Sequence, residues 1–523
     1  MSTAVIWFRR DLRLHDNEAV ATATKNHSDC LFIFTIDPWF YSQPETGWLR
    51  VEFLFEALTA LHDLLAAQGS RLVLLKGSSV EAVTNLLRIM KANNLNPELY
   101  FSHDVQVAYG RDRDNAVKSF CTANAITVHE CYSFFLLHKE AEMDSWRKRY
   151  YTFQQAPKFE VPSDINSSQE TLKIIGTMPT IDPHDIASTM SLTIPKPRQQ
   201  MFRGGEDSGR LALYNFLKSR VDGYHWKISR PFLAQNGATS LLGPHITFGT
   251  LSTRTIYQSA TKHMRKVESV NPKLGFSIAA YLDRIRWRDS FTQRLWFHPE
   301  LMWQNRFPEF DVVYNQEPLQ PLQQEYFERW KSGTTGFPLL DASMRQLQQD
   351  GFINFRMRAM AATFLTINCG ISWHYGAQHF MNCLVDGDIA INHWQWQMQA
   401  GITNPLNPAF RMYDPTKNFR DRDTGAHYVH FWLPETRGKN VETILQSASP
   451  MLNFAETRKI NGKRVADIRK VVRARVLQKH SIEGDKAVTA LRVTTNYKKY
   501  SHDRYKKIFN KADVKQPTAL DDR

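Results

Sequence analysis

The hydrophobic pattern changes once along this chain, and that change restricts the fold more than any other feature. Up to about residue 135, short apolar or β-branched runs alternate with amphipathic segments of helical length. The runs span 5–8, 31–36, 71–75, 99–102 and 127–130, and the clearest helical segments span 48–68, 80–93 and 111–124. Strands that alternate with helices of this length predict an α/β domain built on a doubly wound parallel sheet.

After about residue 205 the pattern becomes helical and stays so to about residue 475. The stretch 157–203, by contrast, is rich in Pro, Ser, Thr and Asp and lacks periodicity, which indicates an exposed linker. We therefore predict an α/β domain at 1–135, an interdomain linker at 136–205, an all-α C-terminal domain at 206–478 and a basic C-terminal extension at 479–523. No G-x-G-x-x-G follows the first strand, so a conventional dinucleotide site is not expected there.

Composition narrows the class of protein. The chain has 523 residues, 42% of them hydrophobic, which is enough for two or three domain cores. No apolar run approaches the roughly 18–20 residues of a membrane span, and the N-terminus does not look like a signal peptide, so we expect no membrane partner. The five cysteines are scattered without a CxxC pair, which favours reduced thiols in the cytoplasm and argues against an iron–sulfur or zinc site.

Positive charge is concentrated near the C-terminus. The formal net charge is +14, and residues 455–511 contain 17 Lys and Arg against 5 Asp and Glu. A basic region of this kind suggests a polyanionic partner such as DNA. A solvated, soluble tail explains the charge equally well, and charge alone does not separate these two interpretations.

The stretch 384–401, LVDGDIAINHWQWQMQAG, is too polar for a plain core helix and too aromatic for a plain loop. It combines carboxylates, an amide, indoles and a thioether, at Asp386, Asp388, Asn392, Trp394, Trp396 and Met398. Such side chains suit a large, flat, redox-active ring, which needs hydrogen bonds at its edge and electron-rich neighbours. We expect the rest of the helical domain to be arranged around this stretch.

Three further clusters lie in the helical half. The turn 237–243 carries hydroxyls and small residues that can hold a phosphate, although simple helix capping by Thr239 or Ser240 is the commoner explanation. The segment 281–289 places cations beside an indole, which can grip phosphates and stack a base, or can form surface salt bridges. In the segment 354–358, an Arg facing the interior would need a carboxylate partner, which Asp386 or Asp388 could supply.

In their order and spacing, these motifs resemble those of the photolyase/cryptochrome family. The similarity extends from residue 4 to about 475 and rests on WFRRDLRLHDN, TGFPLLDASMRQL, the segment 354–358, LVDGD…N…WQW, and FRMYDPTKNF…FWLPE. The closest likeness is to a divergent branch of bacterial-type DNA photolyases. The resemblance implies an antenna-type α/β domain, an all-α domain holding a U-shaped FAD, and electron transfer driven by blue light.

The resemblance also implies roles for individual residues. The FAD pocket would contain Tyr224, Thr239, Ser240, Leu242, Tyr281, Arg288, Arg358, Asp386, Asp388 and Asn392. Arg358 and Asp386 would form a salt bridge beside the flavin ring, and Asn392 would lie opposite flavin N5. The catalytic set would be Trp396 and Trp373 as the first two electron-transfer tryptophans, with Trp287 and Asn392. The DNA lesion would meet Arg284, Trp287, Phe355 and Met398.

This chain departs from the family pattern at several of these places. The third electron-transfer Trp aligns with Gln320, and the second lesion-stacking indole aligns with Met398. Arg284 replaces the Glu that typical members place near a cyclobutane dimer. Phe355 and Ala359 stand where dimer-specific members have Asn and Met, and where the (6-4) branch has histidines. These departures favour cyclobutane dimers over (6-4) products as the substrate.

We accordingly predict a deoxyribodipyrimidine photo-lyase, a carbon–carbon lyase that acts as a monomer on DNA containing UV photoproducts. An electron from excited, reduced FAD would split a dimer that is flipped out of the duplex. An antenna chromophore, either a folate, a deazaflavin or a flavin, is an open expectation. The alternatives are a cryptochrome photoreceptor with the same FAD site and a (6-4) photolyase. The latter needs a general acid, and His393, next to Asn392, would point about 100° away from it on a helix.

Overall fold

A computed structural model describes residues 2–483, except 106–107, 162, 164, 191, 193–196, 198–199 and 408–409. Its sheet has six strands in the order β5-β4-β1-β2-β3-β6. The five parallel strands are β1 (Ser2–Trp7), β2 (Asp29–Ile36), β3 (Leu72–Lys76), β4 (Asn96–Ser102) and β5 (Val128–Cys131). The strand order reverses at β1, so the predicted doubly wound sheet is confirmed.

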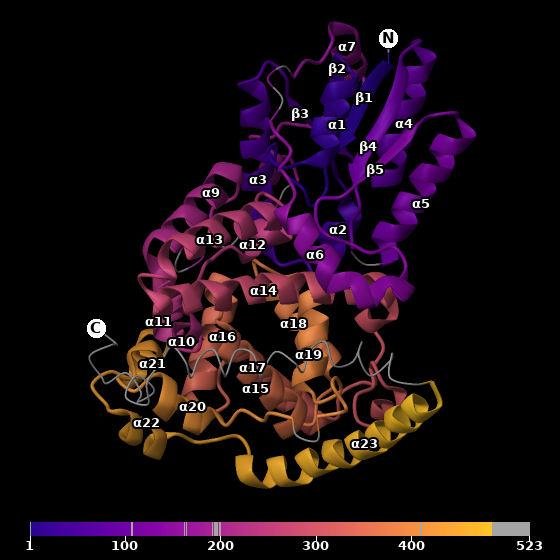
Figure 1. Ribbon diagram of the computed structural model, residues 1–523. Coiled ribbons are helices and arrows are strands. Elements are labelled where there is room, and N and C mark those ends of the chain that lie inside the picture. The colour runs from indigo at the N-terminus through magenta and orange to yellow at the C-terminus, as the bar shows by residue number, and fades with distance from the viewer. Residues whose placement is uncertain are drawn as a thin grey trace.

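Helices cover both faces of this sheet (Figure 1). Side chains of β1 alternate between two apolar clusters, with Ala4 and Ile6 on one face and Val5 and Trp7 on the other. One face packs on α1 (Glu18–Asn26) and α3 (Trp48–Ala66), and the other on α4 (Ser79–Ala92) and α5 (Ala108–Ala123). Burial on both faces explains why these strands are nearly continuous apolar runs in the sequence.

The segment predicted as a linker carries short elements of its own. It contains η1 (Glu140–Ser145), α6 (Trp146–Gln155), α7 (Gln169–Ile175), β6 (Thr180–Ile181) and α8 (Ile186–Thr189). Strand β6 pairs antiparallel with β3, an extension of the sheet that two residues are too short to signal in the sequence. The domain limits at residues 135, 205 and 478 remain predictions.

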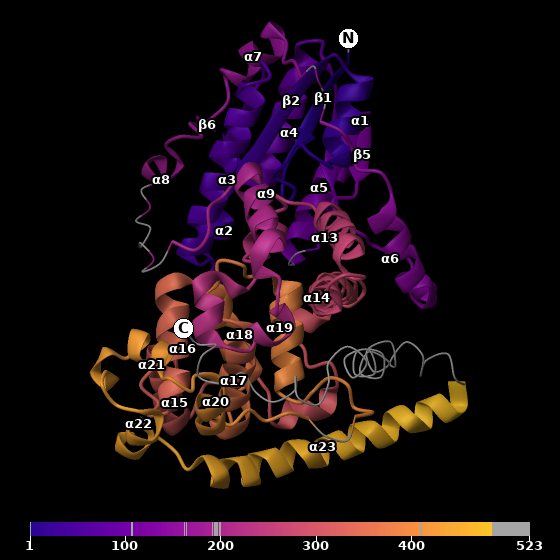
Figure 2. The same cartoon turned by 60° about the vertical axis from the view of Figure 1, so that its left-hand side comes forward.

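The second half of the described chain is helical, as predicted (Figures 1 and 2). Its helices begin with α9 (Glu206–Asn215), α10 (Tyr224–Lys227), α11 (Pro231–Leu233), α12 (Gly243–Thr247), α13 (Thr253–Val267) and α14 (Pro272–Phe297). They continue with α15 (Pro321–Ser332), α16 (Pro338–Asp350), α17 (Phe355–Thr363), α18 (Trp373–Cys383), α19 (Ile389–Gln399), α20 (Pro415–Arg422), α21 (His427–Trp432), α22 (Val441–Ser447) and α23 (Phe454–Glu483). Short 3-10 and π-helical turns connect them: η2 (Phe216–Arg220), η3 (Ala234–Ala238), η4 (Pro299–Met302), η5 (Pro308–Val312), η6 (Phe364–Asn368) and η7 (Pro434–Thr436).

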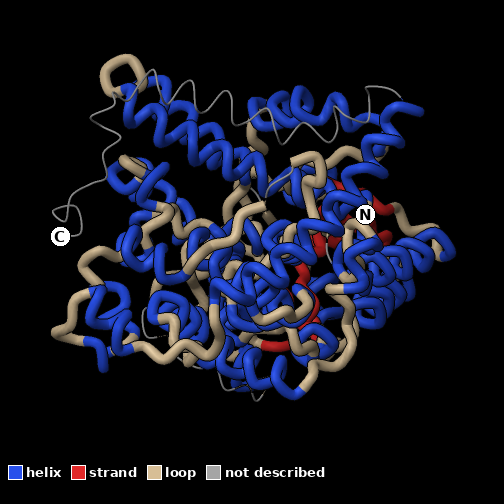
Figure 3. The backbone as a smooth tube through the Cα atoms, turned by 90° about the horizontal axis from the view of Figure 1, so that it is seen from below, coloured by secondary structure: helices blue, strands red, loops and turns tan. Residues whose placement is uncertain are grey.

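Helix α23 runs along the side of the helical half that lies opposite the sheet, and the strands are enclosed by helices when seen from that side (Figure 3). Its Arg469 is buried and donates to the carbonyl oxygens of Thr403 (3.0 Å), Asn404 (2.9 Å) and Asn407 (2.6 Å). One buried cation thereby binds several carbonyl groups of the loop that follows α19. The predicted extension 479–523 lies outside the described residues from 484 onward.

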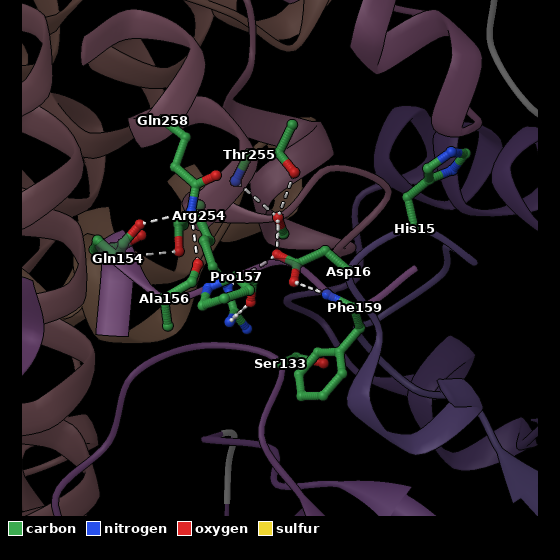
Figure 4. A network of polar contacts seen from close by, with 12 residues as sticks. His15, Asp16, Ser133, Gln154, Ala156, Pro157, Phe159, Arg254, Thr255 and Gln258 are labelled. Atoms are coloured by element: carbon green, nitrogen blue, oxygen red, sulfur yellow. Dashed lines mark hydrogen bonds and ion pairs between the residues drawn. The ribbon is translucent and has the colours of Figure 1, made fainter. Parts of the chain in front are cut away.

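The loop after β1 joins the two halves. Asp16, the last residue of the RRDLRLHD motif, accepts from the Ser252 hydroxyl (2.6 Å) and the Phe159 amide (3.2 Å) and pairs with Arg254 (3.2 Å). Figure 4 shows Asp16 with Phe159 and Arg254 beside it. Gly249 has a φ of +68°, and a Cβ there would overlap the Arg10 carbonyl. The motif thus fixes the position of the sheet against the start of α13.

None of the helices in the described part of the chain is long and apolar enough to cross a membrane.

Candidate flavin site

A cavity of about 300 Å³ lies among α10, α12, α14, α17 and α19. The helical period explains which side chains reach it. On α14, Tyr281, Arg284 and Arg288 share one face because they are three, four and seven positions apart. On α19, Asn392, Gln395, Trp396 and Gln399 share a face for the same reason, and on α17 the lining residues are Phe355, Arg358, Ala359 and Ala362.

Arg358 and Asp386 form the predicted ion pair on the cavity wall. The Arg358 Nη2 lies 3.0 Å from both carboxylate oxygens of Asp386, and its Nε donates to the Ile353 carbonyl at 2.8 Å. A Cβ at Gly243 would lie 2.6 Å from the Asp386 Oδ2, so this close approach requires glycine. Gly243 therefore leaves room for the Asp386 side chain, a contact that the sequence of the turn did not indicate.

Asp388 is held by cations from both halves of the molecule. Its Oδ2 lies 3.2 Å from the Arg10 Nη1 and 3.7 Å from the Arg288 Nη2, and its Oδ1 accepts the Ile391 amide at the N-terminus of α19. Burial alone would raise the pKa of Asp388, but Arg10 and Arg288 outweigh it and hold that pKa below the ordinary value. Asp388 is consequently a buried, ionised carboxylate.

Asn392 and Trp396 are adjacent on the same wall. The Asn392 Nδ2 donates to the Ala377 carbonyl at 2.9 Å, which leaves the amide oxygen as the group able to accept a hydrogen bond from the cavity. Trp396 is 2% exposed, and a Cβ at Gly376 would overlap its ring. Both side chains are thus fixed by α18, where Ala377 and Gly376 lie.

The cavity wall also carries hydroxyl groups, at Tyr224, Thr239, Ser240 and Tyr281. Burial raises the pKa of Tyr224 to about 12 and raises that of Tyr281 further, so both phenols stay protonated. On the described wall of this cavity, the Thr239 Oγ1, the Tyr281 hydroxyl and the Arg288 Nε are buried without a hydrogen-bond partner. Buried donors of this kind need an acceptor, and phosphate or ribityl oxygens of FAD would supply it.

Arg284 lies between two aromatic rings beside this cavity. Its guanidinium carbon is 5.0 Å from the centroid of Trp287 and 5.2 Å from that of Phe355. Arg284 and Phe355 line the cavity, whereas Trp287 packs on the other side of Arg284, near Phe291 at 6.4 Å. The expected lesion-contacting residues Arg284, Trp287 and Phe355 are therefore neighbours.

Four of the predicted site residues are not on the cavity wall. Leu242 is fully buried in an apolar cluster, and its neighbour Leu241 lines the cavity instead. Met398 is two residues past Trp396, roughly 200° around the helix, and so faces elsewhere. Trp287 is half-buried and lies beside the cavity against Arg284, whereas Trp373 is fully buried and its Nε1 donates to the Asn305 Oδ1 at 2.8 Å.

A larger cavity of about 670 Å³ opens at the carboxyl ends of β1 and β2. Its lining includes Phe8, Arg10, Thr35, Trp39 and Tyr109 from the sheet half, and Trp303, His374, Tyr375 and His393 from the helical half. His393 therefore faces this cavity and not the one beside Asn392, as helix geometry predicted. Since the strand order reverses at β1, this is the usual place for a ligand in such a sheet.

Arg10 also belongs to the site, although no motif in the sequence indicated it. It lines the larger cavity, pairs with Asp104 (Nε to Oδ1, 3.2 Å) and also reaches Asp388 on the wall of the smaller one. The sequence around Arg10, RRDLR, is unusually rich in charge. That pattern does not indicate that the partner is Asp388, 378 residues away.

Comparison with known proteins agrees with this geometry. Residues 4–160 match the DNA photolyase family model, and residues 281–481 match the model for the FAD binding domain of DNA photolyase. A cryptochrome DASH from Gloeobacter violaceus is 29% identical over 459 residues, covering 83% of this chain and 86% of that protein. A deoxyribodipyrimidine photo-lyase from Synechococcus sp. is 29% identical over 462 residues, covering 83% and 88%.

Among solved structures, an archaeal photolyase from Sulfolobus tokodaii, crystallised with two FAD molecules, superimposes with a TM-score of 0.72. It is 24% identical, and the match covers 90% of this chain and 99% of that one. The fold, the two family models and the relatives agree, and the chain belongs to the photolyase/cryptochrome family. Its helical half is an FAD-binding domain, and the cavity lined by Arg358, Asp386, Asp388 and Asn392 has the donors and acceptors that FAD requires.

Proposed function

We propose that this protein repairs cyclobutane pyrimidine dimers in DNA under blue light, as a deoxyribodipyrimidine photo-lyase of the cytoplasm. The observation that carries the proposal is the lining of the flavin cavity. It is aromatic and cationic towards Arg284 and Phe355, and none of its lining residues in the described chain is a histidine. Splitting a cyclobutane ring needs an electron to be given and returned, without an obligatory proton shuttle.

The chain's own residues would hold the cofactor and the lesion. Reduced FAD, when bound, supplies an electron on absorbing blue light. Arg358, Asp386 and Asn392 would fix the ring edge, and Thr239 and Ser240 would hold the phosphate or ribityl oxygens. Because the wall around Trp396 is buried, water is excluded from the place where charge separates.

The lesion would stack on Trp287 and Phe355, with Arg284 between them. Stacking of a base on an aromatic side chain contributes roughly 1–3 kcal/mol, which offsets the few kcal/mol needed to flip a damaged base. Arg284 can donate to the carbonyl oxygens of a flipped pyrimidine or to a phosphate beside it. The ionised Glu of typical members can only accept hydrogen bonds. Arg284 would therefore bind acceptor groups of the lesion, where that Glu binds donor groups.

The larger cavity is our candidate for an antenna chromophore. Its position at the switch point of the sheet, its volume and its aromatic walls suit a folate, a deazaflavin or a second flavin. The two FAD molecules of the Sulfolobus tokodaii photolyase give a precedent in a protein of the same fold. Extraction of the purified protein, followed by chromatography of what is released, would identify the compound.

The deciding experiment measures loss of cyclobutane dimers from irradiated DNA under blue light, with chemically reduced protein. Wild-type protein should repair them, Trp287→Ala should lose most of the activity, and (6-4) products should persist. Repair of (6-4) products that disappears in His393→Ala would overturn the assignment. A cryptochrome DASH is among the similar proteins, so repair of neither lesion, in duplex or single-stranded DNA, would favour a photoreceptor.

A further inference from the structure

The position expected to hold the third electron-transfer indole has a structural task instead. Gln320 is exposed and is the N-cap of α15. Its side chain accepts a hydrogen bond from the backbone N–H of Gln323, and its own backbone N–H donates to the Gln323 Oε1 at 3.1 Å. This is a helix cap, and an amide is not a redox-active group. An electron route to the surface through residue 320 is therefore closed.

The same helix carries an indole in its last turn that touches Trp396. The ring centroids of Trp330 and Trp396 are 6.1 Å apart with planes at 73°. Phe380 packs against both, at 5.9 Å from Trp330 and 4.9 Å from Trp396. Trp330 is fully buried, and its Nε1 donates to the Ala361 carbonyl at 3.1 Å. The ring contacts of Trp373 in the described chain are with His374 and His393.

From Trp330 a row of rings continues outward. Phe327 stacks on Trp330 at 6.0 Å and 15°, and it also meets the Tyr375 ring at 5.7 Å. Tyr375 is partly exposed on the wall of the larger cavity, and its hydroxyl donates to the Glu317 carbonyl at 2.8 Å. The row therefore connects the flavin cavity to an oxidisable phenol that solvent can reach.

We propose that Trp330 relays an electron to Trp396 after Trp396 has given one to light-excited, oxidised FAD, and that Tyr375 is the outer end of this route. The proposal rests on the function proposed above, because it requires FAD in the smaller cavity. Electron transfer slows steeply as the gap between rings widens, so rings in contact are favoured. Indole and phenol are the readily oxidised aromatic side chains, whereas Phe327 fills the space between them without being oxidised.

The step balances without breaking a covalent bond in the protein. One electron moves from Trp330 to the Trp396 radical cation, and the Trp330 N–H stays protonated because its partner is a carbonyl and not a base. Tyr375 then gives one electron to Trp330 and releases its phenolic proton to water. An external thiol, the reductant, returns one electron and one proton to Tyr375.

The test uses full-length protein loaded with oxidised FAD, illuminated with blue light in the presence of dithiothreitol without oxygen. Trp330→Phe should slow the bleaching of the flavin absorbance several-fold, and Trp330→Tyr, which remains oxidisable, should restore most of the rate. A purely structural role of Trp330 would affect both variants alike. Trp432→Phe is the matched control, since Trp432 is also a buried indole with one hydrogen bond, to Gln235 at 2.8 Å.

A second readout does not depend on the flavin spectrum. After illumination without thiol, peptide mass spectrometry of wild-type protein should find oxidised products at Trp330 or Tyr375, and Trp330→Phe should lose those at Tyr375. Equal rates of flavin bleaching in Trp330→Phe and Trp432→Phe, with no oxidised product at Trp330 or Tyr375 of the wild-type protein, would overturn the proposal. Wild-type protein that binds no FAD overturns both proposals, whereas FAD-loaded protein that repairs nothing after chemical reduction overturns only the function.

Discussion

At the scale of single residues, Asp388 is the group on which most of the site depends. It joins Arg10 from the sheet half to Arg288 and α19 from the helical half. Removing one partner from a buried ion pair leaves an uncompensated charge and typically costs about 3–5 kcal/mol. Arg10 keeps its ion pair with Asp104 and Arg288 keeps the one with Asp289, but both guanidinium groups lose the carboxylate that joins them, so a change at Asp388 affects stability and cofactor binding together.

We therefore expect Asp388→Asn to lower the free energy of unfolding by several kcal/mol and to release most of the FAD. Flavin absorbance relative to protein absorbance, with urea unfolding, measures both quantities. Asp467→Asn is the control, because Asp467 is an exposed carboxylate that also has an ion-pair partner, Lys470 at 2.8 Å. A variant at Asp388 that keeps its full FAD content and stability would contradict the role assigned to this carboxylate.

Arg284 allows a distinction between two ways of binding DNA. If it meets a phosphate, Arg284→Gln should reduce the dependence of log K on log salt by about 0.9. If it donates to a flipped base, the slope should stay and the preference for damaged over undamaged DNA should fall by about 1–3 kcal/mol. Arg149→Gln, at an exposed cation of α6, is the control. Binding that is unchanged in both slope and preference would remove Arg284 from the interface.

At the scale of elements, the close packing of α18 against α19 positions the Trp396 indole. Gly376 on α18 faces the Trp396 ring so closely that a Cβ would overlap it. We expect Gly376→Ala to lower the free energy of unfolding by about 1–3 kcal/mol through overpacking, despite the better helix propensity of Ala. Thermal unfolding measures the change, and Gly176→Ala at the end of α7 is the control. A more stable Gly376→Ala would mean that the two helices can separate without cost.

Element types were predictable from the sequence because each has a local cause. The five parallel strands are short apolar runs, and the half of the chain predicted as helical is helical. Strand β6 was missed because two residues carry no period. The faces of α14 and α19 also followed from spacing, which explains why Asn392 lies beside Trp396 and why His393 does not face the flavin cavity.

Tertiary arrangement set the limits of that prediction. Leu242 and Leu241 are equivalent in the sequence, and only the backbone of the turn, with a φ of +57° at Leu241, decides which one faces the cavity. The Arg10–Asp388 pair joins residues 378 positions apart, so no local pattern contains it. Trp330 likewise became a candidate donor only once α15 was seen to end beside Trp396.

At the scale of the whole molecule, buried histidines link stability to pH. Burial lowers the pKa of His225, His245, His374, His379 and His393 to about 4 from an ordinary 6.5. The unfolded chain therefore takes up protons below pH 6.5, while the native protein resists them down to about 4. Stability is complete above pH 6.5 and falls as the pH drops from 6.5 towards 4. Asp388 adds nothing in this window, because its lowered pKa acts only below its ordinary value.

Each such histidine costs about 1.4 kcal/mol per pH unit once the unfolded chain is protonated, so several together should produce a steep loss between pH 6.5 and 5. Urea unfolding followed by Trp fluorescence at pH 7.5, 6.5, 5.5 and 5.0 would measure it. His245 is 2% exposed, and its Nδ1 lies 2.8 Å from the Thr250 hydroxyl, so a Gln at this position should keep a hydrogen bond. His245→Gln should therefore reduce the slope of the unfolding free energy against pH by the contribution of one proton, about 1.4 kcal/mol per pH unit. A wild-type stability that is constant from pH 7.5 to 5.0 would contradict this account, because it would require these buried rings to accept protons in the native state as easily as in water.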